Sequence, residues 1–296
     1  MKTILFLAVI FLNFTHLFAQ TNINLSLNVK EGDTFISDYK LTSSSLQNVN
    51  GEEQIVKKET NYSILFNVLQ PKSDTSYYIK LRLKKIRYII DIQGNTRTFD
   101  SDSINKDYIA KQDSFLLNVN NGYNFEISKK NKIISIDSIN LLTFGDTKTS
   151  LLKGIKSVRF LNLFFPKFPS EKIGINKKWI IADTTKHDIY NITNKTNTLS
   201  NTYENNITIN SKSKIFSDKN KAHEANSYFI FYNLNGNRKS DIKLLKKTLF
   251  AKGVNISENI NGTAEIKYSK DGGAIYSWPL TIKNIISINT HKISDK

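Results

Sequence analysis

The stretch TKTSLLKGIKSVRFLNLFF, residues 147–165, interrupts a chain in which apolar and polar residues otherwise alternate. Its apolar residues recur in steps of three and four, which places them on one face of an α-helix. Lysine and arginine recur on another face, at Lys153, Lys156 and Arg159. Pro166 follows directly and ends the pattern, because proline disfavours helical geometry in the residue before it. The stretch predicts one amphipathic helix.

Two interpretations of this helix remain open. In the first, its apolar face packs on a sheet and its basic face lies in water. In the second, it is an interfacial helix that lies on a membrane or shields an apolar cavity, which the nearby aromatic residues favour. The residues expected to line either a core or a ligand cavity are Leu151, Leu152, Ile155, Val158, Leu161, Phe164 and Phe165, together with Trp179 and Trp278.

The sequence on both sides of the helix is typical of β-strands. Residues 58–92 form two alternating arms around a turn at 71–74, and the apolar positions change phase near Lys84. Because side chains alternate with a period of two, this change predicts a bulge or a change of buried face. Further strands are expected at 21–30, 35–46, 96–99, 123–128, 132–137, 187–199, 202–216, 225–234, 241–252, 258–269 and 274–289.

These strands predict a mainly β fold, with an antiparallel curved sheet or open barrel and the helix packed on its concave side. The last two strands form a hairpin around residues 270–273, and Pro279 is expected at an edge or a bulge because it cannot donate to the ladder. One β-rich unit covers residues 20–296. It can be divided into halves at 21–137 and 171–296, joined by a helical segment at 138–170.

The first 19 residues have the features of a secretory signal peptide. A basic Lys2 precedes an apolar run from Ile4 to Leu12, and cleavage is expected after Ala19. The chain has no cysteine, which excludes disulfides, thiolate metal ligands and the cysteine that a bacterial lipid anchor requires. We therefore expect an exported protein, periplasmic or extracellular, with no lipid anchor and no transmembrane span.

The formal net charge is +16, which can attract nucleic acid or anionic lipid. The lysines are spread over every expected strand, and export argues against nucleic acid as a partner. The sequence lacks zinc-binding, nucleophile-elbow and phosphate-loop motifs. His187 stands beside Asp188, but neighbouring strand residues point to opposite faces. No catalytic, cofactor-binding or metal-binding residue is predicted.

Several residues carry a family resemblance. They are the LNVKEGDTF run at 27–35, the Ser/Thr-rich strand after it, the FDSD step at 99–102, and Gly174 with Trp179. These features resemble an uncharacterised family of secreted β-rich proteins of Gram-negative bacteria, a domain of unknown function. The resemblance implies export and a β fold, and it supplies no catalytic residue.

The sequence thus favours a non-enzymatic exported protein that binds an envelope partner or an apolar ligand such as lipid. The alternatives are a structural envelope protein without a small ligand and a hydrolase whose site is assembled from distant acids. A hollow interior under the helix is expected for the protein that binds an apolar ligand, and a filled interior is expected for the structural protein without a small ligand.

Overall fold

The protein is described by a computed structural model. It covers residues 22–49, 51–102, 122–137, 158–181, 185–186, 191–202, 205–216, 229–267 and 275–293. The expected signal peptide at 1–19, the hairpin turn at 270–273, and His187 with Asp188 lie outside these residues. Leu151, Leu152, Ile155 and the lysines at 153 and 156 also lie outside them.

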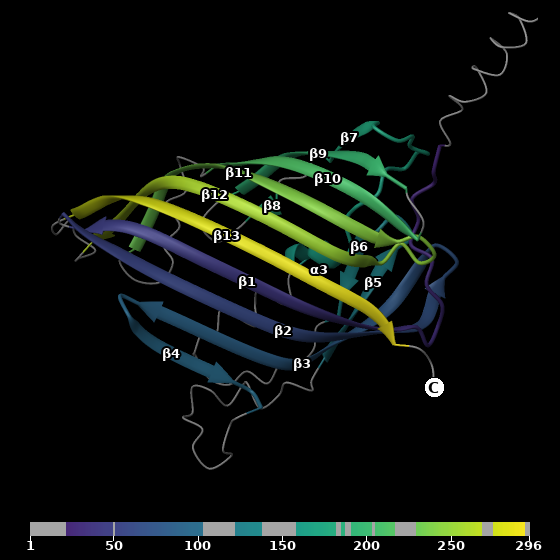
Figure 1. Cartoon of the computed structure of the whole chain (residues 1–296). Helices are drawn as coiled ribbons and strands as arrows, with labels where there is room; N and C mark the ends of the chain where they lie inside the picture. The colour runs from purple at the N-terminus through teal and green to yellow at the C-terminus, as the bar shows by residue number, and fades with distance from the viewer. Residues whose placement is uncertain are drawn as a thin grey trace, which may run out of the picture.

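The described chain forms one 13-stranded antiparallel sheet that curves but does not close (Figure 1). The strand order is β6-β5-β3-β2-β1-β13-β12-β11-β10-β9-β7, with β4 paired to β3 and β8 paired to β9. The expected open, antiparallel, mainly β architecture is therefore confirmed. The strands are β1 Thr34–Val49, β2 Glu52–Ser73, β3 Ser76–Ile92, β4 Asn95–Asp100, β5 Gly122–Ser128, β6 Ile133–Ile136, β7 Lys178–Ile181, β8 Thr185–Lys186, β9 Asn191–Asn201, β10 Asn206–Phe216, β11 Phe229–Leu245, β12 Ala251–Lys267 and β13 Ile275–Ile293.

The first and last strands meet in the middle of the sheet. β1 pairs with β13 over the register Thr34–Ile293 to Gln47–Leu280. From this seam, chain order runs outward to β6 on one side, and it returns inward from β7 on the other. The segment between β6 and β7 contains α3, Val158–Phe164, which lies behind the sheet in Figure 1. The chain therefore passes from one sheet edge to the other by way of α3.

The phase change in β3 corresponds to a bulge. Ser63 of β2 pairs with Lys85, whereas Ile64 pairs with Leu83, so Lys84 is the additional residue. Leu83 and Ile86 are consequently both buried, although they are three positions apart. The bulge thus keeps Leu83 and Ile86 on the same buried face, in agreement with the bulge that the sequence suggests near Lys84.

Two strand predictions are wrong. The regions 225–234 and 241–252 were expected as separate strands, but β11 is continuous from Phe229 to Leu245 and the turn falls at 246–248. The middle of β11 is polar, so the alternation of apolar residues that would indicate one continuous strand is interrupted there. Pro279 is also not on an edge strand, because β13 is central. The β1 register ends at the Gln47–Leu280 pair, so Pro279 lies just past it and pairs with Thr263 of β12.

The segment before β1 crosses one end of the curved sheet. It was expected as a strand, but its only described ladder contact is the Ile23–Ile173 bridge. Leu27 N–H donates to the Lys129 carbonyl at 2.7 Å, and Asn28 N–H donates to the Thr248 carbonyl at 2.9 Å. Its alternate residues Leu25, Leu27 and Val29 are nevertheless buried. The segment therefore covers this end of the core by joining the β5–β6 turn to the β11–β12 turn.

Candidate functional site

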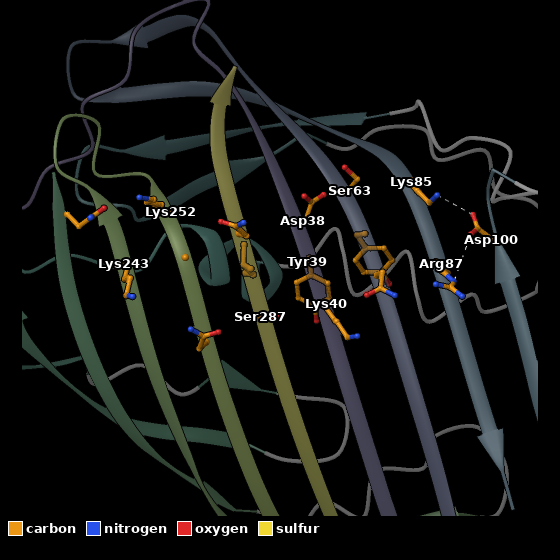
Figure 2. A pocket seen from close by; sticks show the side chains of 17 residues that line it. Asp38, Tyr39, Lys40, Ser63, Lys85, Arg87, Asp100, Lys243, Lys252 and Ser287 are labelled. Carbon is orange, nitrogen blue, oxygen red and sulfur yellow. Dashed lines mark ion pairs between the residues drawn. The ribbon is translucent and has the colours of Figure 1, made fainter. Parts of the chain in front are cut away.

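A depression of about 820 Å³ lies on the convex face of the sheet (Figure 2). Its side chains come from the central strands and are mostly polar or charged, and Figure 2 shows Asp38, Lys85 and Lys243 spread along them. Lys40 forms an ion pair with Glu59 at 2.9 Å, and Arg87 lies 3.9 Å from Asp100. These pairs are solvent-exposed, and such pairs add little stability. The geometry is that of a solvated sheet face.

The Asp100-Ser-Asp102 step is held by basic side chains. Lys85 pairs with Asp102 and lies 3.8 Å from Asp100, and the hydrogen bond that its amine donates to Asp102 raises the pKa of Lys85. In the described part of the chain, no group of three or more His, Asp and Glu residues is arranged to hold a metal ion. This step is therefore a set of surface ion pairs.

The concave face is filled around α3 by an aromatic core. Phe165, next to the helix, has ring centroids 5.6 Å from Phe66, 5.5 Å from Phe125 and 4.9 Å from Phe250. Phe35 stacks on Phe250 with a centroid distance of 4.2 Å. We call this set the aromatic core: Phe35, Tyr39, Tyr62, Phe66, Phe125, Phe160, Phe164, Phe165 and Phe250, all buried. Under α3 the interior is packed side chains.

The residues in and next to α3 that were predicted to line a core or cavity differ in their exposure to solvent. Leu161, Phe164 and Phe165 are buried, as expected for core residues, but Val158 is 46% exposed. Each helical residue turns the chain by about 100°, so Val158 lies on the side of the helix away from Phe160 and Phe164, which face the sheet. Arg159, expected in water, is half-buried. The buried face is therefore centred on the phenylalanines.

The two tryptophans lie in different environments. Trp179 on β7 is partly buried and packs against the cluster that contains the aromatic core. Trp278 on β13 is 4% exposed and belongs to a separate group, and its indole N–H donates to Gln47 Oε1 at 3.0 Å. We call that group the second apolar cluster: Ile192, Ile215, Leu234, Ile260, Trp278, Leu280 and Ile282. No residue of α3 belongs to it.

A row of polar side chains crosses the concave face between these two apolar regions. Ser213, Arg238, Glu258 and Asn284 are paired in register on β10, β11, β12 and β13. The next row outward pairs Ile215, Gly236, Ile260 and Ile282 on the same strands. We call the first set the polar row. It separates the aromatic core from the second apolar cluster.

The polar row contains a buried ion pair. Arg238 Nη1 lies 3.1 Å from Glu258 Oε1, and the two side chains are 14% and 1% exposed. Asn284 Nδ2 donates to Glu258 Oε2 at 2.9 Å. Both carboxylate oxygens therefore have partners, as a charge in this environment requires.

Beside the polar row lies a small cavity of about 70 Å³. Four cationic side chains from separate parts of the fold line it: Arg159 of α3, Lys167 after it, Lys195 of β9 and Arg238 of β11. No carboxylate is among the described side chains that line this cavity. The other described residues that line it are Asn162, Leu163, Ile181, Ile192 and Ser213. We call this the cationic cavity, and Ile192 joins it to the second apolar cluster.

Lys195 has the most perturbed amine in the cationic cavity. Burial, together with the charges of Arg238 and Lys167, lowers its pKa to about 7. Within the described residues no ion pair or hydrogen bond satisfies this amine. Burial also lowers the pKa of Lys167.

The cationic cavity cannot be recognised in the sequence, because its residues are far apart in the chain. A signal is present in β11 and β12, however. Arg238 alternates in phase with the buried residues Leu234 and Ile242, and Glu258 alternates with Val254, Ile256 and Ile260. A charge at an inward position of a strand is unusual, because burying it requires a partner.

Comparison with solved structures reveals similarity of fold. A structure of lipovitellin, described in terms of its lipid–protein interactions, aligns with a TM-score of 0.53, 12% identity and coverage of 91% of this chain. This chain spans only 26% of the lipovitellin chain. An outer membrane channel from Pseudomonas putida F1 aligns with a TM-score of 0.23 and 9% identity, covering 92% of this chain and 100% of the channel.

Further findings concern the sequence and the described helices. Curated protein sequences gave no match. Among the described residues, no helix has the length and apolar character needed to cross a membrane. The expected resemblance to an uncharacterised family is confirmed over one segment, which begins in α3 and ends at the start of β12: residues 159–251 match DUF6263, a family of unknown function.

Proposed function

We propose that this protein is a non-enzymatic binding protein that holds an amphiphilic ligand such as a lipid on the concave side of its sheet. The observation that carries the proposal is the adjacency of the cationic cavity and the second apolar cluster, which share Ile192. A ligand with a charged group and an apolar chain matches this adjacency, because each part meets side chains of suitable chemistry.

The aromatic core restricts where such a ligand binds. It fills the space between α3 and the sheet, so the ligand does not lie under the helix. An apolar chain that leaves the cationic cavity meets Ile192 first and then Ile215 on the neighbouring strand. The likeness to lipovitellin concerns the fold, and it is compatible with this proposal without specifying a ligand.

Export forms part of the same proposal, and it rests on the N-terminal sequence and the lack of cysteine. A protein that binds an envelope partner is the second candidate. It is favoured by the two short strands at the ends of the sheet path, where Ile134 of β6 is 53% exposed and Ile180 of β7 is 68% exposed. Edge strands with exposed apolar residues are surfaces on which another chain can pair.

The direct test is the content of the purified protein. We expect protein prepared without detergent, or the delipidated protein incubated with a lipid extract, to retain an amphiphile at a ratio near one per chain. Native mass spectrometry of the intact complex, followed by organic extraction, measures this. A protein that emerges free of amphiphile and takes up none from the extract contradicts the proposal and favours the edge-strand partner.

A further inference from the structure

We infer that the convex face of strands β10 to β13 is a docking surface for an anionic lipid bilayer. This inference does not depend on the amphiphile proposed for the concave side, because it concerns the opposite face of the sheet. The described side chains that point outward there are mostly lysine and neutral polar residues. We call this surface the basic face. Its exposed lysines are Lys212, Lys214, Lys239, Lys243, Lys252 and Lys283.

The two halves of the convex face differ in how their charges are balanced. On the other half, Figure 2 shows Lys85 and Arg87 of β3 joined to Asp100. On the basic face, Asp241 is the only carboxylate among the outward side chains that the structure describes on β10 to β13. No ion pair formed by described residues includes a lysine of the basic face. The outer surface therefore has an excess of positive charge on one half.

Two lysines of the basic face lie directly opposite each other. Lys212 of β10 is the register partner of Lys239 of β11. The Cβ atoms of such partners are about 4.5–5.5 Å apart, and like charges in this arrangement destabilise the sheet. A layer of lipid phosphates would relieve the repulsion, because negative headgroups attract basic side chains at a membrane surface.

The row that contains these opposed lysines also carries exposed aliphatic side chains. From Lys239 the register leads across β12 to Ile285 of β13, which is 61% exposed. From Lys212 it leads across β9 to Ile180 of β7, which is 68% exposed. Interfacial protein surfaces combine these two chemistries, because ammonium groups meet headgroups while aliphatic groups enter the acyl boundary. A soluble polyanion would supply the negative charge but no apolar layer, so the row favours a bilayer.

The test is co-sedimentation of the purified protein with lipid vesicles. Vesicles of phosphatidylcholine alone are compared with vesicles of equal parts phosphatidylcholine and phosphatidylglycerol, each at low and at high salt. The variant Lys212→Gln/Lys239→Gln removes the opposed lysines. Its control, Lys80→Gln/Lys85→Gln, removes the same charge from the outward side of β3. Circular dichroism monitors the fold of each variant.

The control is matched in charge but separated in space. Strand β3 lies about 24 Å from β11 along the sheet, at ~4.8 Å per strand. This exceeds the Debye length of about 10 Å at 0.1 M salt, so charges on β3 act weakly on lipids bound at the basic face.

We expect the protein to bind the phosphatidylglycerol vesicles at low salt, to be released at high salt, and not to bind phosphatidylcholine alone. Each lysine near an anionic surface contributes about fivefold in affinity. Lys212→Gln/Lys239→Gln should therefore weaken binding about 25-fold, whereas Lys80→Gln/Lys85→Gln should change it less than about twofold.

The aliphatic part of the surface has its own pair of variants. Ile285→Ser should weaken binding to the phosphatidylglycerol vesicles about fivefold, because it removes a group that enters the acyl boundary. Ile55→Ser is the control, since Ile55 is 40% exposed on the outward side of β2. It should leave binding unchanged.

The remaining outcomes overturn the inference. Equal losses in the two lysine variants would show that net charge alone attracts the vesicles, without a defined surface. Equal binding to both kinds of vesicle would remove the role of the lysines. Binding of soluble polyglutamate as tight as that of the anionic vesicles, with no loss in Ile285→Ser, would identify a soluble polyanion as the partner. Each of these results leaves the concave amphiphile standing, because native mass spectrometry of the purified protein tests it separately.

Discussion

Phe165→Ala should lower the free energy of unfolding by about 3–5 kcal/mol, the usual cost of removing a buried phenylalanine. Its ring contacts Phe66 of β2, Phe125 of β5 and Phe250 before β12, and it is 0% exposed. Three parts of the sheet would therefore border the void. Equilibrium denaturation in urea, followed by circular dichroism, measures the change in unfolding free energy.

The matched control for this variant is Val158→Ala, in the helix next to it. Val158 belongs to the apolar face expected from the sequence, but it is 46% exposed. Its truncation should change the unfolding free energy by no more than about 0.5 kcal/mol, as for an ordinary surface substitution. If Val158→Ala were the more damaging change, the helix would be rotated relative to this description, with the sequence-derived face buried.

Glu258→Gln should lower the free energy of unfolding by about 3–5 kcal/mol, because it leaves the Arg238 charge buried without its partner. The side chains of Arg238 and Glu258 are only 14% and 1% exposed, so water cannot replace the lost carboxylate. The double variant Arg238→Met/Glu258→Leu removes both charges. It should be close to wild type or more stable, because the desolvation cost of both ions disappears.

The exposed pair Lys40–Glu59 is the natural comparison for this effect. It has a similar N–O distance of 2.9 Å, but its side chains are 50% and 29% exposed. Glu59→Gln should therefore cost less than about 1 kcal/mol. Thermal and urea unfolding of the four proteins, measured in parallel, gives the ranking. Equal losses for Glu59→Gln and Glu258→Gln would show that the polar row is solvated.

The titration of Lys195 adds a pH dependence with a definite sign. Burial places its folded-state pKa near 7, below the ordinary value of 10.5, so the unfolded chain binds more protons between these pH values. Stability of the ligand-free protein should therefore rise with pH across that interval. Melting temperatures of wild type and Lys195→Met across this range measure the contribution.

Much of the fold can be predicted from the sequence, because strand periodicity depends on local residue order. The long β2–β3 hairpin and the change of phase near Lys84 follow from alternation alone, and the ladder shows that this change is a bulge. The helix between two β-rich regions follows from the change of period. Its rotation does not, since that depends on which side chains fit the aromatic core. Phe160 and Phe164 displace Val158 from the buried face because larger rings bury more apolar surface.

The candidate site could not be assembled from the sequence, for a physical reason. Arg159, Lys195 and Arg238 come together only because β9, β10 and β11 pair in register and α3 crosses the concave face. The spacing of these three residues in the sequence gives no information about that register. The inward phase of Arg238 and Glu258 is the local signal, and the ladder then places them side by side. Trp278 was expected as a lining residue, but its separation from the helix core also depends on register.

The most direct test of the account is the position of a bound apolar chain, read by tryptophan quenching. The chain has two tryptophans, so Trp179→Phe leaves Trp278 in the second apolar cluster and Trp278→Phe leaves Trp179 on β7. Each variant is titrated with a terminally brominated undecanoate and with undecanoate itself. We predict saturable quenching of Trp278 by the brominated ligand alone, stronger than that of Trp179. Quenching confined to Trp179, or absent from both at ligand saturation, would contradict a ligand chain lying along the second apolar cluster.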